Sequence, residues 1–494
     1  MSLRISGQTA ALATAILASS LGFMDGTVVS IAVPAIRRDL SASLAAIQWV
    51  SNGYTLVLAA FILAGGALGD RLGVRNVLNA GVAVFTLSSL LCALAPSAEM
   101  LILARVAQGF GAALMIPSSL ALIAKTFPEA ERGKAIGTWA ATSSVAAALG
   151  PLLAGFVVGP LGWRPVFFVN LPLAGLALAV SLALVPRDAP AAPARGLDMP
   201  GALLAAAGLG ALALGLTSAG EARPLVPGSP ALWCAAGAAC LAAFLAWEAR
   251  ANAPMLPLAL FRSRVFAAAN ALTFFLYAAL GGLMFYLPQA LITGHGAGAA
   301  RTAGVFLPFP VMMGLLSRWS GSLADRAGAR GPLIAGSILA ALGFASLGWA
   351  VNSAQVWTGV PAAMTLVAAG FGLAVSPLSA VVMHSAGPAR AGAASGVNNA
   401  VSRVAGLLAV ALFGLAAVAA HRLAVAAAPD ALREAAQALA FGGGEAGLPP
   451  QLDALRAHAD RIAFGAIAAV SSLCALVAAG CAACLIPGKR PVPR

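Results

Sequence analysis

Two charged residues, Asp25 and Arg105, lie in stretches of the sequence that are otherwise apolar. The apolar stretches run over 9–36 and 100–124, and Asp25 is the only one of the 16 acidic residues that lies well inside such a stretch. A carboxylate held away from water is costly unless it is paired, hydrated or protonated. Asp25 can therefore bind and release a proton, or it can be the structural partner of a buried arginine such as Arg105. The sequence leaves both roles open.

A second charged pattern occurs twice. The ten residues 66–75, GALGDRLGVR, return 255 positions later as GSLADRAGAR at 321–330, with six of the ten positions identical. Glycine permits a sharp reversal of the chain and arginine binds anionic headgroups, so each copy fits a tight loop between two membrane helices. An alternative role, in which the charged residues of a turn only anchor the chain at the membrane surface, would explain a single copy. Two copies predict two related halves, as in secondary transporters. The residues to which we assign a gating role are Gly66, Asp70, Arg71, Gly73, Arg75, Gly321, Asp325, Arg326, Gly328 and Arg330.

The composition sets the class of protein. The 494 residues are 61% hydrophobic and only 9% charged, which is typical of an all-α polytopic membrane protein. Fourteen stretches of about 17–25 apolar residues are long enough to cross a bilayer as helices. Most Lys and Arg residues outside these spans lie on the side of the termini and of both turns, so we expect both termini in the cytoplasm. The net charge of +13 then reflects topology and needs no nucleic acid as a partner.

The repeat also predicts the domain boundaries. The first turn follows the second span and its copy follows the tenth, so two extra helices must separate two six-helix halves. We expect an N-terminal six-helix bundle at 1–186 and a linker with two inserted transmembrane helices at 187–264. A C-terminal six-helix bundle should follow at 265–494, with an outer loop at 421–461. The inserted helices, near 200–219 and 230–247, should lie at the periphery.

Small residues dominate the fifth span, 135–158. Gly150, Pro151 and Gly155 combine a flat face for close helix packing with a proline kink. This element, the turn at 66–75 and the run Arg105–Ala113 resemble the three signature motifs of the drug:proton antiporters of the major facilitator superfamily. The stretch Asp25–Pro34 resembles the first-span motif of the fourteen-span branch, the EmrB/QacA type.

The resemblance implies a fold, a function and roles for residues. It implies two six-helix bundles that rock around a central cavity, and proton-coupled export of lipophilic or cationic drug-like compounds. It also implies proton coupling by Asp25 and Arg105, a gate at the two turns and an antiporter hinge at Gly150, Pro151 and Gly155. The hinge differs from the family pattern in having alanine at Ala146 and Ala154, where glycine is usual.

Other features narrow the alternatives. The four histidines show no metal-ligand spacing, and no phosphate-binding glycine loop or catalytic triad is present, so we expect no enzyme, no metal and no cofactor. The expected partners are a small-molecule substrate, protons and the lipid bilayer of the bacterial cytoplasmic (inner) membrane; use of a periplasmic adaptor stays open. An exporter of one specific metabolite is the alternative on the same scaffold. The candidate residues of the substrate cavity, for which ordinary packing is an equal alternative, are Trp49, Asn52, Gln108, Phe274, Tyr277, Asn398, Asn399 and Arg403.

Overall fold

The computed structural model describes most of the chain. The described residues are 7–186, 198–219, 226–387, 390–429, 432, 435, 439, 441–442 and 448–488. Within the helices, some side chains, including those of Asp70 and Asp325, also lie outside the described part. Residues 187–197, in the predicted linker, lie outside the described part altogether.

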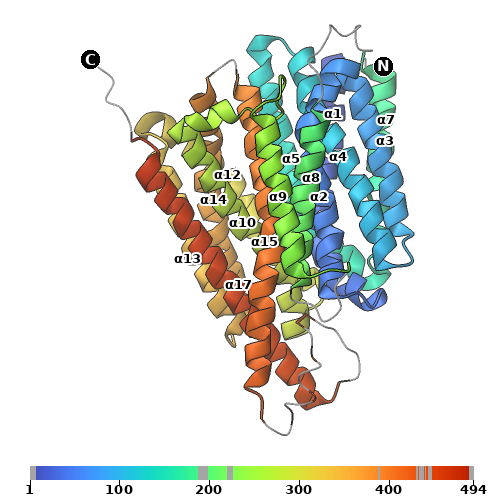
Figure 1. The fold of residues 1–494 in the computed structure, drawn as a ribbon, viewed down its shortest axis with the longest axis vertical. Coiled ribbons are helices and arrows are strands. Elements are labelled where there is room, and N and C mark those ends of the chain that lie inside the picture. Colours follow the sequence, from blue (N-terminus) through green and yellow to red (C-terminus); the bar gives the residue numbers. More distant parts are fainter. Residues whose placement is uncertain are drawn as a thin grey trace, which may run out of the picture. The chain divides into compact units, whose positions relative to one another are not determined.

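All regular elements of the described residues are helical (Figure 1). The first half contains α1 (Gly7–Asp39), α2 (Leu44–Leu72), α3 (Val74–Ala93), α4 (Ala98–Thr126), α5 (Glu129–Leu161), α6 (Pro165–Phe168) and α7 (Asn170–Leu184). Then come α8 (Met199–Ser218), α9 (Pro230–Glu248) and the 3-10 helix η1 (Leu258–Arg262). The second half contains α10 (Arg264–His295), α11 (Ala299–Gly304), α12 (Pro308–Ala327), α13 (Arg330–Asn352), α14 (Val356–Ala386), α15 (Ala391–Ala426) and α17 (Pro450–Leu485).

The helices agree with the predicted membrane spans. In the described part of the chain, 13 helical segments are long and apolar enough to cross a membrane. The fifth predicted span falls on α5, whose described apolar stretch, Val145–Leu161, is shorter. The prediction of an all-α polytopic membrane protein is therefore confirmed.

The chain forms two compact units. Unit 1 is Met1–Ala35, Trp49–Leu212 and Trp233–Leu256, and unit 2 is Ile36–Gln48, Ala213–Leu232 and Pro257–Arg494. Four helices, α1, α2, α8 and α9, contribute residues to both units. Each unit is described by itself below.

Glycines at matched positions allow close helix packing in each unit. In unit 1, α3 packs on α4, and a Cβ at Gly81 would lie 2.8 Å from the backbone nitrogen of Met115. In unit 2, α13 packs on α14, and a Cβ at Gly336 would lie 2.6 Å from the carbonyl oxygen of Gly370. Gly81 and Gly336 are separated by the same 255 positions as the two charged turns. The duplication therefore extends to the backbone contacts of the core.

One predicted boundary is wrong. Residues 421–461 were expected to be an outer loop, but α15 continues to Ala426 and α17 begins at Pro450. A helix of 36 residues is about 54 Å long, whereas the hydrocarbon core is about 30 Å thick. An apolar stretch marks only the part of such a helix that crosses the bilayer. As a result Asp460, expected in the loop, is a fully buried residue of α17, and Asp25 is not the only acid inside a helical span.

Candidate functional site

The centre of unit 1 is a buried polar cluster around Asp25 of α1. Arg105 of α4 donates from Nη1 to Asp25 Oδ2. Gln108 donates from Nε2 to Asp25 Oδ1 at 3.0 Å, and Asn170 of α7 donates from Nδ2 to the same oxygen at 2.9 Å. All four side chains are at most 1% exposed. The structure therefore brings Asp25 and Arg105 into direct contact and satisfies both carboxylate oxygens.

Arg105 is fixed by groups from several helices. Its Nε donates to the carbonyl oxygen of Val50 in α2 at 3.0 Å, and its Nη1 also donates to Gln108 Oε1 at 2.7 Å. Its guanidinium carbon lies 4.4 Å from the centre of the Tyr54 ring, a cation–π distance. Tyr54 in turn donates its hydroxyl to the carbonyl of Gly22 at 2.8 Å. Arg105 is therefore held by α2 and by its own helix as well as by Asp25.

Sequence reasoning missed two members of this cluster. Asn170 Nδ2 also donates to Ser89 Oγ at 3.0 Å, and Ser89 Oγ donates to the carbonyl of Phe167 at 2.9 Å. Asn170 Oδ1 has no hydrogen-bond partner among the described residues. An amide at one end of the apolar stretch 165–186 was the available signal. It is weaker than the charge that marked Asp25.

The predicted hinge contacts α1 at Gly150 and through the carbonyl of Ala147. Because Pro151 has no N–H, the carbonyl of Ala147 loses its usual partner within α5. Thr27 of α1 donates its hydroxyl to this carbonyl at 2.7 Å. A Cβ at Gly150 would lie 2.3 Å from Thr27 Oγ1 and 2.8 Å from the carbonyl oxygen of Met24. Gly150 and Pro151 together therefore join α5 to the segment of α1 that carries Asp25. Gly155 is buried in the same helix.

In unit 2, too, a side-chain hydroxyl donates to a backbone carbonyl that a proline leaves without its usual partner. Pro377 of α14 frees the carbonyl of Leu373, and Ser320 of α12 donates its hydroxyl to that carbonyl. Ser320 corresponds to Gly65 across the repeat. In unit 1, Pro117 frees the carbonyl of Ala113, and a Cβ at Gly65 would lie 2.1 Å from that oxygen.

The two charged turns have the same backbone conformation. Gly73 has φ 96° and Gly328 has φ 92°, values that glycine adopts without strain, and each lies just before a helix start. Arg71 and Arg326 are exposed. The packing around the first glycine of each turn differs. A Cβ at Gly321 would lie 2.8 Å from Ser376 Oγ, whereas at Gly66 the nearest atom would be 3.6 Å away, an ordinary contact distance. The aspartate side chains of both turns lie outside the described residues.

The last arginine of each turn binds the end of another helix. Arg75 donates to the carbonyls of Ser181 and Leu182 of α7 at 3.2 and 2.9 Å. Arg330 donates to the carbonyl of Ala483 of α17 at 2.5 Å. The carbonyl end of a helix carries partial negative charge, so a cation stabilises it. These hydrogen bonds join α3 to α7 in unit 1 and α13 to α17 in unit 2.

We expect Arg75→Ala to lower the free energy of unfolding by about 1.5–3 kcal/mol, because the buried guanidinium donates two hydrogen bonds. Arg330→Ala should cost less, because Arg330 is exposed to solvent. Thermal unfolding of the purified variants in detergent measures both, with Arg75→Lys as the variant that keeps the charge. Equal losses at the two positions would contradict this reading.

The predicted substrate residues are divided between the units. Trp49, Asn52 and Gln108 belong to unit 1, and all three are buried. Gln108 is part of the Asp25 cluster, so its amide is engaged by charged groups. Asn52 Nδ2 has no hydrogen-bond partner within the described chain. This leaves Asn52 with an unused donor in the interior.

The other five candidates belong to unit 2. Asn398 of α15 donates from Nδ2 to Thr273 Oγ1 of α10 at 2.6 Å, so it is used in helix packing. The Tyr277 ring lies 6.1 Å from that of Phe371, edge to face. Phe274, Tyr277, Asn398 and Arg403 are partly buried, and Asn399 is exposed.

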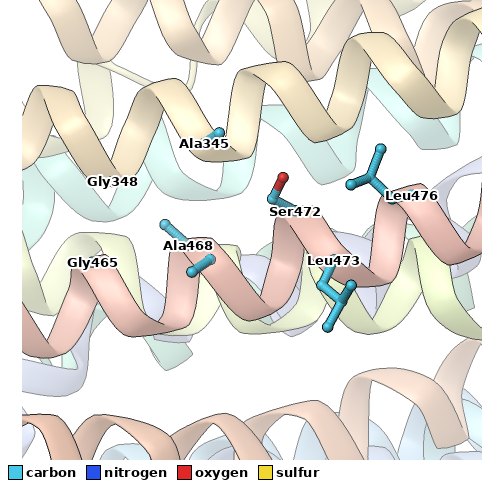
Figure 2. A pocket seen from close by; sticks show the side chains of 8 residues that line it. Ala345, Gly348, Gly465, Ala468, Ser472, Leu473 and Leu476 are labelled. Atoms are coloured by element: carbon cyan, nitrogen blue, oxygen red, sulfur yellow. The ribbon is translucent and has the colours of Figure 1, made fainter.

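A cavity of about 510 Å³ lies elsewhere in unit 2, between α13 and α17. It exists because small side chains, such as Ala345 and Ala468, line both helices (Figure 2). In Figure 2, Ser472 points toward α13, where it donates to the carbonyl of Ala341 at 2.9 Å. Leu473, also on its lining, is 61% exposed. None of the predicted substrate residues lines this cavity, and its apolar lining offers no charge-bearing group.

Comparisons with known proteins agree with the fold and with the superfamily that the sequence resembles. The family model of the Major Facilitator Superfamily matches residues 15–410. The "Multidrug resistance protein Stp" of Mycobacterium tuberculosis is 35% identical over 81% of this chain and 74% of its own. The "Tetracenomycin C resistance and export protein" of Streptomyces glaucescens is 35% identical over 81% of this chain and 75% of its own. A crystal structure of a bacterial homolog of the human lysosomal transporter Spinster, inward-facing and unoccupied, superposes with a TM-score of 0.67, at 17% identity over 98% of both chains.

Proposed function

The chain belongs to the major facilitator superfamily of membrane transporters, and from that premise we propose that it exports lipophilic or cationic drug-like compounds in exchange for protons. We place it in the fourteen-span drug:proton antiporter branch. The two bundles, 1–186 and 265–494, would alternate access by rocking against each other, with α8 and α9 as the inserted pair. The names of the relatives, which describe resistance and export, support this class of substrate.

The observation that carries the proton-coupling role is the buried carboxylate of Asp25. In its charged form it accepts hydrogen bonds from Arg105, Gln108 and Asn170. A proton on Asp25 weakens this acceptor and releases donors on α4 and α7 at once. Loading and unloading a proton would thus change the packing of three helices, which is what coupling to a conformational cycle requires.

Efflux from everted membrane vesicles tests the proposal. A proton gradient across vesicles that contain the protein should drive accumulation of lipophilic cationic dyes, and a protonophore should abolish it. Accumulation that persists without a gradient would contradict proton coupling.

A second candidate is export of one specific metabolite on the same scaffold. The name of the Streptomyces relative cites a single compound, tetracenomycin C, and this supports export of one metabolite as the second candidate. Transport of a panel of unrelated dyes, measured beside transport of the cell's own biosynthetic products, separates the two candidates. Transport of one compound only would overturn the multidrug assignment.

We further propose that the protein lies in the bacterial cytoplasmic membrane with both termini in the cytoplasm. Its energy would come from the proton gradient without a cofactor. Transport by the purified protein in proteoliposomes, which contain no other protein, tests whether a periplasmic adaptor is required.

We expect Asp70→Asn and Asp325→Asn to slow transport without removing the protein from the membrane. Asp70 should be the more sensitive position, because the first turn matches the family pattern more fully, with Leu72 where the second turn has Ala327. Initial efflux rates at matched protein levels measure both effects. Unchanged or equal rates would count against a latch at these turns.

A further inference from the structure

Unit 2 contains a buried acid that the proposed function does not use. Asp460 of α17 is fully buried. It accepts a hydrogen bond from Thr293 Oγ1 of α10 at 2.7 Å and one from Arg456 Nη1 at 3.3 Å. A fully buried carboxylate is costly unless its charge is compensated, and buried ionisable groups of this kind are frequent at functional sites. Asp460 therefore calls for a functional explanation.

A histidine lies next to this acid. Nε2 of His421, on α15, is 3.6 Å from Asp460 Oδ1. His421 is 2% exposed, and its Nε2 has no hydrogen-bond partner in the described part of the chain. A buried imidazole nitrogen without a partner, facing a carboxylate oxygen, is placed to take up a proton and to pass it to the acid.

The surrounding charges come from three helices. Arg456 pairs with both Asp460 and the half-exposed Asp453 on α17. Arg422 of α15 and Arg37 of α1 add positive charge near the pair. The nearest polar groups of α10, Thr293 and Gln289, do not titrate. Arg461, the remaining cation of this part of α17, donates to the carbonyl of Gly294. The charged Asp460 is thus well compensated, and among its described titratable neighbours His421 has a ring nitrogen, Nε2, without a hydrogen bond.

The same carboxylate holds a loop segment. The backbone N–H of Gly442 donates to Asp460 Oδ1 at 2.9 Å, and Arg37 Nη1 donates to the carbonyl of Phe441 at 2.6 Å. Gly442 has φ 66°, and a Cβ there would lie 2.9 Å from Arg37 Nη1. The segment Phe441–Gly442 is therefore bound to the helices at two adjacent points, one of which is Asp460.

We propose that Asp460 and His421 form a second proton-binding site, and that a proton taken up there loosens Phe441–Gly442 from α17. The proton comes from solution and adds one positive charge to the pair; no other covalent bond forms or breaks. On Nε2 of His421 it is donated to Asp460 Oδ1 and competes with Gly442 for that oxygen. On Asp460 itself it removes the negative charge that strengthens the bond from Gly442.

The proposal rests on the proposed function for its place in transport. By the proposed topology, this end of α17 is on the outer side, from which protons enter. Proton uptake would then loosen the loop on the side where substrate leaves. The loop response itself can be measured without transport.

Hydrogen–deuterium exchange of the full-length purified protein tests the site. Peptides that contain residues 439–442 are followed over a pH series, with the intrinsic exchange rate corrected at each pH. Protection of the wild type should fall about tenfold on acidification, because one charge-assisted hydrogen bond is lost. Asp460→Asn should show the low protection at every pH. Glu99→Gln, which removes the charge of an exposed acid on α4 in unit 1, should behave as the wild type.

A variant of the histidine separates the two groups. His421→Gln should move the loss of protection to lower pH, because the carboxylate alone must then take the proton. An unchanged midpoint would remove His421 and overturn the two-residue site. Protection that does not depend on pH in the wild type would overturn the proposal altogether, even if efflux is proton-driven. A pH-dependent loop in a protein without proton-driven efflux would instead sink the proposed function and leave this site standing.

Discussion

Asp25→Asn is expected to abolish efflux driven by a pH gradient, while exchange of substrate down its own gradient partly survives. The neutral amide resembles the protonated acid, so Arg105, Gln108 and Asn170 stay in the released arrangement throughout the cycle. Asp25→Glu should keep some coupling with an altered pH dependence. Vesicle efflux at several pH values measures both variants.

Folded protein must be measured beside efflux. If Asp25 is only the structural partner of Arg105, removing its charge leaves a buried cation unpaired and costs about 3–5 kcal/mol. Protein levels would then fall, and loss of efflux would say nothing about protons. A well-folded Asp25→Asn protein that still concentrates substrate would sink the coupling role of Asp25. If that residual activity disappears on adding Asp460→Asn, the coupling role passes to Asp460.

The second large effect is expected for Gly150→Val. The side chain would collide with Thr27 and with the backbone of Met24, so α5 and α1 must separate. Overpacking of this kind costs about 1–3 kcal/mol and displaces the segment that carries Asp25. We expect transport to be lost even at temperatures where the protein remains folded. Efflux from vesicles measures the loss of transport, and thermal unfolding of the purified protein measures the loss of stability.

The matched control is Gly137→Val on the same helix. No atom lies within 4 Å of a Cβ at Gly137, so the same substitution should leave stability and efflux near those of the wild type. Thr27→Val distinguishes the effect of side-chain size from the effect of the hydrogen bond. Valine has the shape of threonine but leaves the Ala147 carbonyl without its donor. Normal transport by Gly150→Val would remove the hinge from the mechanism.

Charge inside apolar stretches was the most informative signal in the sequence. It identified Asp25 and Arg105, and the 255-residue repeat predicted the matched turns and helices. Gln108, three positions after Arg105, lies on the same helix face and could have been assigned to the Asp25 cluster by helical spacing alone. It was instead grouped with the substrate residues.

The contacts of other residues could not be predicted because they join positions far apart in the sequence. Asn170 reaches Asp25 across 145 positions, and Arg75 reaches Leu182 across 107. Asp460 was missed for another reason. Its helix begins well before the apolar stretch that marks the membrane span, and an amphipathic first part of a helix resembles a loop in hydropathy.

Under the proposed proton exchange, the charge of the substrate determines how much net charge crosses the bilayer in each cycle. The buried pair has no net charge when Asp25 is ionised and one positive charge when Asp25 holds a proton, because Arg105 does not titrate in this range. For each proton carried by Asp25, exchange against a monovalent cation moves no net charge across the bilayer. Exchange against a neutral compound moves one charge, and the membrane potential then adds about 2.3 kcal/mol for every 100 mV. At a given proton gradient, an energised membrane would therefore concentrate neutral substrates more steeply than cationic ones.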